Sequence, residues 1–148
     1  MSHEQQFCTF FVDGLRFGVP VLGVQEVLKF QPMTSVPRAP RIVRGLINLR
    51  GQIVTAVDLR TRLDLPPRGG PRKPMNVVLR TEDSTASLLV DEIGDVIDAP
   101  EEAFEPTPRT FSASMRELVV GVYKLEDDLL LVLDPKAALD TSANAGAD

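Results

Sequence analysis

The apolar residues of this chain fall in short runs that alternate with polar residues, a pattern typical of β-strands with one face in a core. Asp13-Gly14 and Arg50-Gly51 separate neighbouring runs and predict two tight hairpins; both residues of Asp13-Gly14 tolerate the positive φ angles of such a turn. Two further stretches, 59–63 and the residues after 134, have room for about one helical turn. The predicted strands cover residues 6–12, 16–21, 24–30, 45–49, 52–57, 75–81, 86–90, 93–97, 119–125 and 129–133.

The two halves of the chain repeat one pattern. Residues 45–63 align without gaps on residues 121–139, an offset of 76, and residues 7–28 follow residues 76–97 at an offset of 69. Each half reads as a hairpin, a strand, an irregular proline-rich loop, a second hairpin and one helical turn. Chance alternation of apolar residues is the competing explanation, but the turn positions and the helix-capping aspartates match as well.

About five short strands per half predict a mostly β fold of two SH3-like five-stranded β-barrels with short helical turns. The approximate boundaries are residues 7–64 for the first barrel and residues 75–140 for the second. Residues 65–74 contain four prolines and two glycines, and we expect them to form a loop between the barrels. Residues 141–148 are small and polar and are expected to form a flexible tail.

The net charge of −5 on 148 residues is divided unevenly along the chain. Residues 1–74 carry eleven Lys and Arg against five Asp and Glu, a net of +6, whereas residues 75–148 carry a net of −11. An asymmetry of this kind indicates charged interaction surfaces. The sequence shows no long apolar run and no apolar leader after a charged start, so we expect a cytoplasmic protein.

Few residues in the chain are suited to catalysis or metal binding. The one histidine, His3, lies in a terminus expected to fray, and the one cysteine, Cys8, lies in an apolar run and is expected to be a buried structural thiol. Gly69-Gly70 is followed by proline instead of a helix, which argues against a phosphate-binding loop. We expect no enzymatic activity, cofactor or metal; a carboxylate pair brought together by folding stays open as the enzymatic alternative.

Single-stranded nucleic-acid binding is the other alternative. Nine Lys and Arg residues lie between positions 38 and 73, and small barrels do bind single strands. No aromatic residue lies between Met33 and Pro74, although stacking of bases needs exposed aromatic rings. A pI near 4.9 also argues against this function.

Several motifs, taken in order, resemble those of the CheW family of bacterial chemotaxis coupling proteins over nearly the whole chain. They are Phe17-Gly18-Val19, Val24-Gln25-Glu26-Val27, Val36-Pro37, the stretch VRGLINLRGQIV at residues 43–54, Val57-Asp58-Leu59-Arg60 and Leu89-Val90-Asp91. The resemblance implies a single CheW-like domain over residues 1–148, with two SH3-like barrels. It also implies a non-enzymatic adaptor that couples methyl-accepting chemoreceptors to a chemotaxis histidine kinase. Ser87 stands where the family usually has glycine.

The same resemblance implies which residues contact partners. A groove between the barrels would bind the cytoplasmic tips of the chemoreceptors; its residues would be Val21, Val24, Glu26, Ile93 and Val96. A second surface would serve coupling to the CheW-like regulatory domain of the kinase or to other CheW-like domains in ring-type arrays; its residues would be Gly45, Asn48, Arg50, Gly51, Arg41 and Arg44.

Two of these assignments have a simpler explanation from the residues alone. The apolar positions of the groove could be ordinary core, because they have β-strand spacing. Gly51 could serve only the positive φ of its hairpin. Arg50 is different, because a turn tip does not require a guanidinium, and the planar fork of arginine suits a fixed carboxylate such as Glu26.

Overall fold

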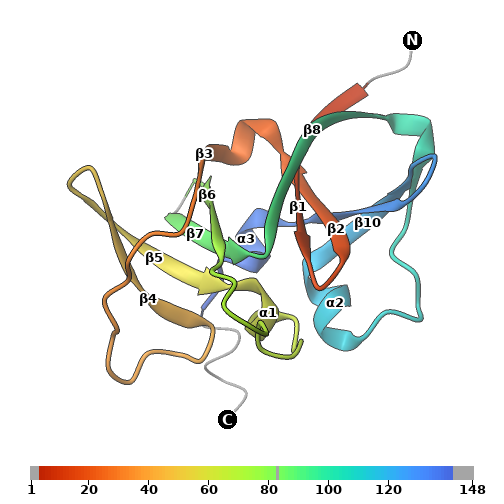
Figure 1. Ribbon diagram of the computed structural model, residues 1–148. Coiled ribbons are helices and arrows are strands. Elements are labelled where there is room, and N and C mark those ends of the chain that lie inside the picture. The colour runs from red at the N-terminus through yellow and green to blue at the C-terminus, as the bar shows by residue number, and fades with distance from the viewer. Residues whose placement is uncertain (1–3, 83, 142–148) are drawn as a thin grey trace.

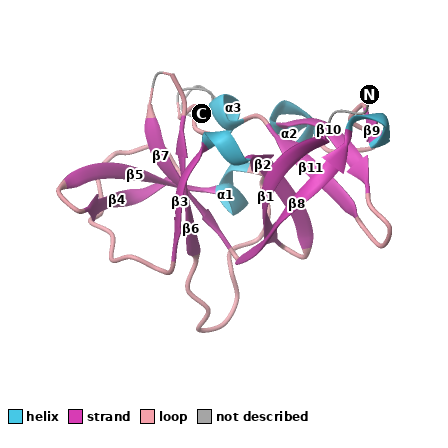
Figure 2. Ribbon diagram, turned by 90° about the horizontal axis from the view of Figure 1, so that it is seen from above, coloured by secondary structure: helices cyan, strands magenta, loops and turns pink. Residues whose placement is uncertain are grey.

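The computed structural model describes residues 4–82 and 84–141, whose strands form two sheets with helices α1 and α3 between them (Figures 1 and 2). The strands are β1 (Glu4–Val12), β2 (Leu15–Pro20), β3 (Val24–Leu28), β4 (Val43–Leu49), β5 (Gln52–Asp58), β6 (Met75–Arg80), β7 (Thr85–Val90), β8 (Glu92–Pro100), β9 (Phe104–Glu105), β10 (Val119–Lys124) and β11 (Leu129–Leu133). The helices are α1 (Leu59–Arg62), α2 (Ala113–Leu118) and α3 (Pro135–Ala138), with 3₁₀ turns η1 (Val21–Gly23) and η2 (Glu101–Ala103).

The two sheets do not follow the two halves of the sequence. Lobe I has the strand order β3-β6-β7-β5-β4, and lobe II has the order β8-β1-β2-β11-β10-β9. The first hairpin of each half therefore joins the later strands of the other half. This corrects the expected division into one barrel over residues 7–64 and another over residues 75–140, while the mostly β, two-barrel class is confirmed.

The apolar residues of the exchanged hairpins explain why they lie at the centre. Along β6, Val77 and Leu79 pack in a central core shared by both lobes, whereas Val78 packs inside lobe I. Leu88 and Leu89 of β7 divide in the same way. A strand that is apolar on both faces is stable only between two apolar layers, and the exchange provides both layers. The two lobes consequently share one core.

Strand register confirms the internal repeat. β2 pairs in parallel with β11, with Phe17 opposite Leu131, and β7 pairs in parallel with β5, with Ala86 opposite Thr55. These pairs are related by the offsets of 69 and 76 that align the two halves of the sequence. The antiparallel pairs β1–β8 and β6–β3 correspond in the same way. The repeat therefore extends to the hydrogen-bonded partners of each strand.

Each barrel is closed by a segment that follows its outer strand. In lobe I the backbone N–H groups of Thr34 and Leu46 donate to each other's carbonyls at 2.9 and 2.8 Å, and in lobe II β9 pairs with β10. Gly45 lies beside this bridge, where a Cβ atom would lie 2.6 Å from the Thr34 carbonyl oxygen. A Cβ atom at the equivalent Gly121 would collide with the ring of Phe104. Both glycines thus allow the barrels to close.

The predicted turns and caps are present. Asp13, Gly14, Arg50 and Gly51 have φ angles of 54°, 79°, 51° and 90°, as the two tight hairpins require. Asp58 accepts a hydrogen bond from the backbone N–H of the second residue of α1 at 3.0 Å. Asp134 caps α3 with the same geometry.

Other expectations need correction or lie outside the described residues. Helix α2 occupies the second proline-rich loop, which the sequence predicted to be irregular; Ser112 caps it by accepting from the backbone N–H of Met115 at 3.2 Å. Cys8 is half-buried against the central core instead of fully buried, and burial raises the pKa of its thiol. His3 and residues 142–148 of the predicted tail lie outside the described residues.

Candidate functional site

Strands β3 and β8 carry most of the residues predicted to line the receptor groove, and they lie on either side of η1 (Figure 1). Val24 and Ile93 occupy equivalent positions and are half-buried against the central core. Val96 is 56% exposed, and its equivalent Val27 is 40% exposed. Val21 is half-buried in η1. The structure thus places Val24 and Ile93 partly in the core, whereas Val96 is available to a partner.

The predicted acid–base pair is formed within lobe I. Arg50, at the tip of the β4–β5 hairpin, donates from its guanidinium to the carboxylate of Glu26 on β3. The Glu26 side chain is 18% exposed and that of Arg50 is 73% exposed. The hydrogen bond to Glu26, followed by the charge of Glu26, raises the pKa of Arg50. The pair holds the Arg50 side chain in one orientation, and the side of its guanidinium that faces away from Glu26 stays open to solvent.

Three neighbours of Arg50 have structural roles. The Asn48 side-chain oxygen accepts from the backbone N–H of Gly51 at 2.9 Å, which stabilises the hairpin turn. Gly51 has the positive φ that this turn needs. Gly45 is buried at the bridge that closes lobe I. These residues shape the surface that presents Arg50.

The two arginines of the predicted coupling surface differ in their surroundings. The guanidinium of Arg44 donates to the buried carboxylate of Asp58 at 3.1 Å. Arg41 is exposed beside this pair, at the rim of a small cavity of about 220 Å³. Substitution of Arg44 would disturb the residue that caps α1. Arg41 is therefore the cleaner position at which to test charge.

An ion-pair network at the junction of the lobes was not predicted. Asp91, between β7 and β8, accepts from Arg60 at 3.0 and 2.7 Å and from Arg68 at 2.8 Å. Its carboxylate also accepts from the backbone N–H of Asp13 in the β1–β2 turn at 2.8 Å. Burial would raise the pKa of Asp91, but the hydrogen bonds from Arg60, Asp13 and Arg68 outweigh burial and lower it to about 2. The network connects a helix of lobe I to a hairpin of lobe II.

Most of the predicted basic cluster is paired internally. Besides Arg44, Arg50, Arg60 and Arg68, the structure pairs Arg62 with Glu117, Arg72 with Glu92, and the ammonium of Lys73 with the ring of Phe30. A nucleic-acid site needs free cations and open aromatic faces. The sequence showed the cluster, but the acidic partners come from distant positions, so sequence spacing gave no signal for the pairing. Among the contacts of residues 4–82 and 84–141, none supports the nucleic-acid alternative.

The charge division survives the exchange of hairpins. The sequence assigned to lobe I, residues 21–90, carries eleven Lys and Arg against five Asp and Glu, a net of +6. The remaining residues, 1–20 and 91–148, carry a net of −11. The two exchanged segments, 1–20 and 75–90, each have a net charge of −1, so the exchange leaves the division unchanged. The protein is consequently bipolar, with one basic and one acidic lobe.

Within residues 4–82 and 84–141, no group of three or more His, Cys, Asp and Glu side chains is arranged to hold a metal ion. None of the helices in the described part of the chain is long and apolar enough to cross a membrane.

The fold and the candidate site together define a class of protein. It is a two-lobed β binding protein whose duplicated barrels exchange hairpins and expose charged side chains. A family model, the CheW-like domain, matches residues 6–143, and the chain belongs to this family. The chemotaxis protein CheW of Bacillus subtilis is 29% identical over 143 residues, covering 97% of this chain and 92% of that protein. CheW of Treponema pallidum is 30% identical over 139 residues, covering 90% and 82%. The crystal structure of the scaffolding protein TtCheW from Thermoanaerobacter tengcongensis has a TM-score of 0.79 at 27% identity, with 89% and 90% coverage.

Proposed function

We propose that this protein is a cytoplasmic, non-enzymatic adaptor that couples methyl-accepting chemoreceptors to a chemotaxis histidine kinase. The proposal rests on membership of the CheW-like family, whose relatives carry the name chemotaxis protein, and on a solved relative described as a scaffolding protein. The observation that carries it is the Glu26–Arg50 pair, which presents a fixed guanidinium on a hairpin tip. No cofactor is required for such a role.

The receptor surface would be formed by β3, β8 and η1. A helical receptor tip has an apolar stripe that suits an apolar groove. The members of this surface are Val21, Val24, Glu26, Ile93 and Val96. Among these members Val24 and Ile93 also support the core, so the exposed side chain of Val96 and the open part of Val21 would contribute more of the contact energy.

The coupling surface would be formed by the β4–β5 hairpin and its base. Arg50 would contact the CheW-like regulatory domain of the kinase, and Arg41 would add charge attraction. Gly45, Asn48 and Gly51 would act by shaping the hairpin, and Arg44 by holding Asp58. Other CheW-like domains in ring-type arrays would bind to the same surface.

Receptor binding is best tested at Val96. We expect Val96→Asp to reduce binding of the receptor tip in calorimetry by more than about tenfold, because a carboxylate would be desolvated in an apolar contact. The unfolding midpoint should not change, since Val96 is exposed. Val120→Asp is the matched control, because Val120 is 53% exposed on a different part of lobe II. Equal affinity of the Val96→Asp protein and the wild type would refute the groove assignment.

A further inference from the structure

The exposed apolar side chains of Leu22, Val27 and Val96 lie on the three elements of the proposed receptor surface. Leu22 in η1 is 99% exposed, and Val27 on β3 and Val96 on β8 are 40% and 56% exposed. Exposed apolar side chains that share one surface mark a contact site more often than single ones do. These three suit the apolar stripe of an amphipathic helix.

The strand register defines the two ends of this surface. On β1, Phe7 pairs with Pro20, directly before η1, and also with Ile97 on β8. Phe11, further along β1, pairs with Glu92, the first residue of β8. The last part of β8 therefore lies at the η1 end of the surface, and Glu92 lies at the opposite end.

The loop of residues 65–74 reaches both sides of the surface at that opposite end. The Arg72 guanidinium pairs with the Glu92 carboxylate at 2.8 Å. The Lys73 ammonium lies 4.8 Å from the ring centroid of Phe30, which follows the end of β3. The loop therefore connects the far end of β3 to the start of β8.

The start of the loop is held in place as well. The Pro66 carbonyl accepts from the Arg60 guanidinium at 2.7 Å, and Arg68 donates to Asp91 at 2.8 Å. Cations that are already held in position lose less conformational freedom when a partner binds. The loop thus presents the cations at its end in a fixed place.

This end of the surface has an excess of positive charge. Three exposed cations lie there: Lys29, which directly follows β3, and Arg72 and Lys73 of the loop. Arg72 is paired with Glu92, but the pair is exposed and costs little to exchange for another partner. The ring of Phe30 is uncharged, so it does not neutralise Lys73.

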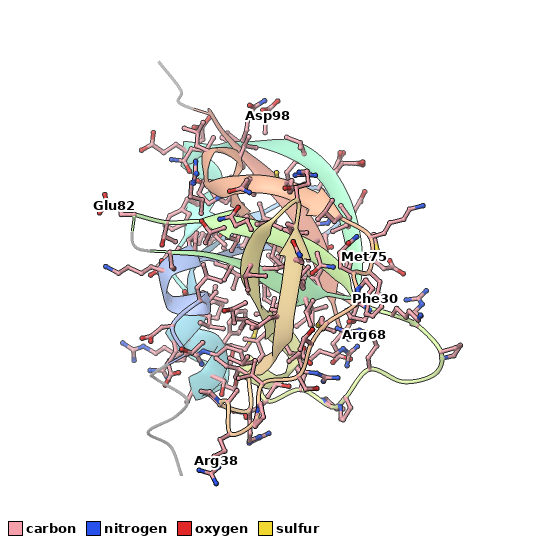
Figure 3. All side chains as sticks on the ribbon, turned by 90° about the vertical axis from the view of Figure 1, so that its left-hand side faces the viewer. Phe30, Arg38, Arg68, Met75, Glu82 and Asp98 are labelled. Carbon is pink, nitrogen blue, oxygen red and sulfur yellow. The ribbon has the colours of Figure 1, made fainter. Side chains whose placement is uncertain are left out.

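The η1 end has the opposite character. Asp98 is exposed on β8, two residues after Val96 and therefore on the same face of the strand. Figure 3 shows Asp98 at the top of the view and Phe30 and Met75 together lower down. No Lys or Arg occurs in the sequence around η1 and the end of β8, which comprises residues 4–6, 20–25 and 94–98. The surface therefore has an acidic end and a basic end, with apolar side chains between them.

We propose that this charge arrangement makes the receptor surface select helices with acidic side chains at one end of their apolar stripe, and that it sets the direction in which such a helix lies. The inference rests on the proposed function, because it concerns the same surface. In the favoured direction the acidic side chains would meet Lys29, Arg72 and Lys73. In the reverse direction they would meet Asp98, and such like-charge contacts disfavour the wrong orientation.

The test measures binding of two designed helical peptides to the full-length protein by calorimetry. Each peptide has about 20 residues and a leucine stripe; the acid peptide has Glu at one end of the stripe, and the base peptide has Lys there. At about 20 mM salt, Arg72→Glu, Lys73→Glu should weaken the acid peptide by about tenfold and strengthen the base peptide by a similar factor. Both effects should fade at about 500 mM salt, because exposed charges are then screened. Each comparison is made within one peptide, so differences in helicity cancel.

Two further variants separate this inference from the proposed function. Val96→Asp should abolish binding of both peptides, because it removes the apolar contact itself. Arg80→Glu, an exposed charge reversal outside the loop, is the matched control and should change neither affinity. If Val96→Asp abolishes binding but the loop reversal leaves both affinities unchanged, the inference fails and the receptor surface stands. If Val96→Asp has no effect on the acid peptide, the receptor surface fails and the inference fails with it.

The direction of the helix is tested by NMR. A nitroxide on the acidic end of the acid peptide should broaden the amide signal of Phe30 and leave that of Leu22 unaffected. Broadening of Leu22 instead, or of both signals equally, would overturn the proposed direction. A wild type that binds the acid peptide no better than the base peptide would overturn the proposed selection.

Discussion

The Asp91 network makes a quantitative prediction about the junction of the lobes. Asp91→Asn keeps a side-chain oxygen but removes the negative charge that pairs with Arg60 and Arg68. Both arginine side chains are only 11% exposed, so water replaces the lost partner poorly. The substitution should therefore destabilise the contact between α1 and the β1–β2 hairpin.

The pKa of Asp91 gives the magnitude. Its fall from 3.8 to about 2 corresponds to about 2.4 kcal/mol of folding free energy. Screening where the network meets solvent reduces this to about 2 kcal/mol. Because the pKa is lowered on folding, the stabilisation is complete above about pH 4 and is lost as the pH falls toward 2.

Urea unfolding at pH 7 and at pH 3 tests this reasoning. At pH 7 the Asp91→Asn protein should be less stable than the wild type by about 2 kcal/mol, and at pH 3 the difference should shrink because Asp91 of the unfolded wild type, with its ordinary pKa of 3.8, is then largely protonated. Asp98→Asn, an exposed carboxylate on β8, is the matched control and should change stability by less than about 0.5 kcal/mol. Equal effects of the two substitutions, or a difference independent of pH, would refute the explanation.

Three further substitutions separate structural from functional roles. Arg50→Ala should reduce kinase pull-down without lowering the unfolding midpoint, and Arg50→Lys should restore little, because lysine lacks the planar fork; full recovery with lysine would contradict this. Gly45→Ala should destabilise by about 1–3 kcal/mol in urea, since its Cβ would meet the Thr34 carbonyl; unchanged stability would disprove that close approach. Leu88→Ala, in the shared core, should cost about 2–5 kcal/mol and unfold both lobes in one transition, whereas two separate transitions would refute a single cooperative unit.

The shared core has a consequence for an adaptor. Because the first hairpin of each half lies in the lobe of the other half, neither lobe can unfold or rotate without disturbing the central layer. Surfaces on β3, β8 and the β4–β5 hairpin are therefore held in a fixed relation to one another. On the proposed function, the protein would couple its partners through their relative placement.

Ser87 illustrates how the structure accounts for a departure from the family pattern. Its hydroxyl is fully buried on β7 and donates to the side-chain oxygen of Asn76 at 2.8 Å. The Asn76 side-chain nitrogen in turn donates to the carbonyl of Lys29 at 3.1 Å. At the equivalent position of lobe II, a Cβ on Gly18 would lie 2.9 Å from a methyl group of Leu130, so that side chain would have to shift. The serine is thus part of a satisfied polar pair between strands.

The sequence alone determined the local features of this protein. Asp13-Gly14 and Arg50-Gly51 produce hairpins because each contains a glycine, which accepts positive φ without strain. Asp58 and Asp134 cap helices because their carboxylates reach free N–H groups two residues on. These effects act over a few residues, so they can be read from spacing. The internal repeat was found by matching these turns and caps between the two halves of the chain. The Glu26–Arg50 pair was predicted from the resemblance to the CheW family.

The tertiary structure decided which strands pair and which charges meet. Apolar alternation indicates a strand but not its partner, so the exchange of hairpins was settled by packing of both faces of β6 and β7. Arg60 and Asp91 are 31 positions apart, and no local pattern connects them. The pairing that turns a basic cluster into internal contacts, and the position of the 65–74 loop beside β3 and β8, arise only when distant segments are packed together.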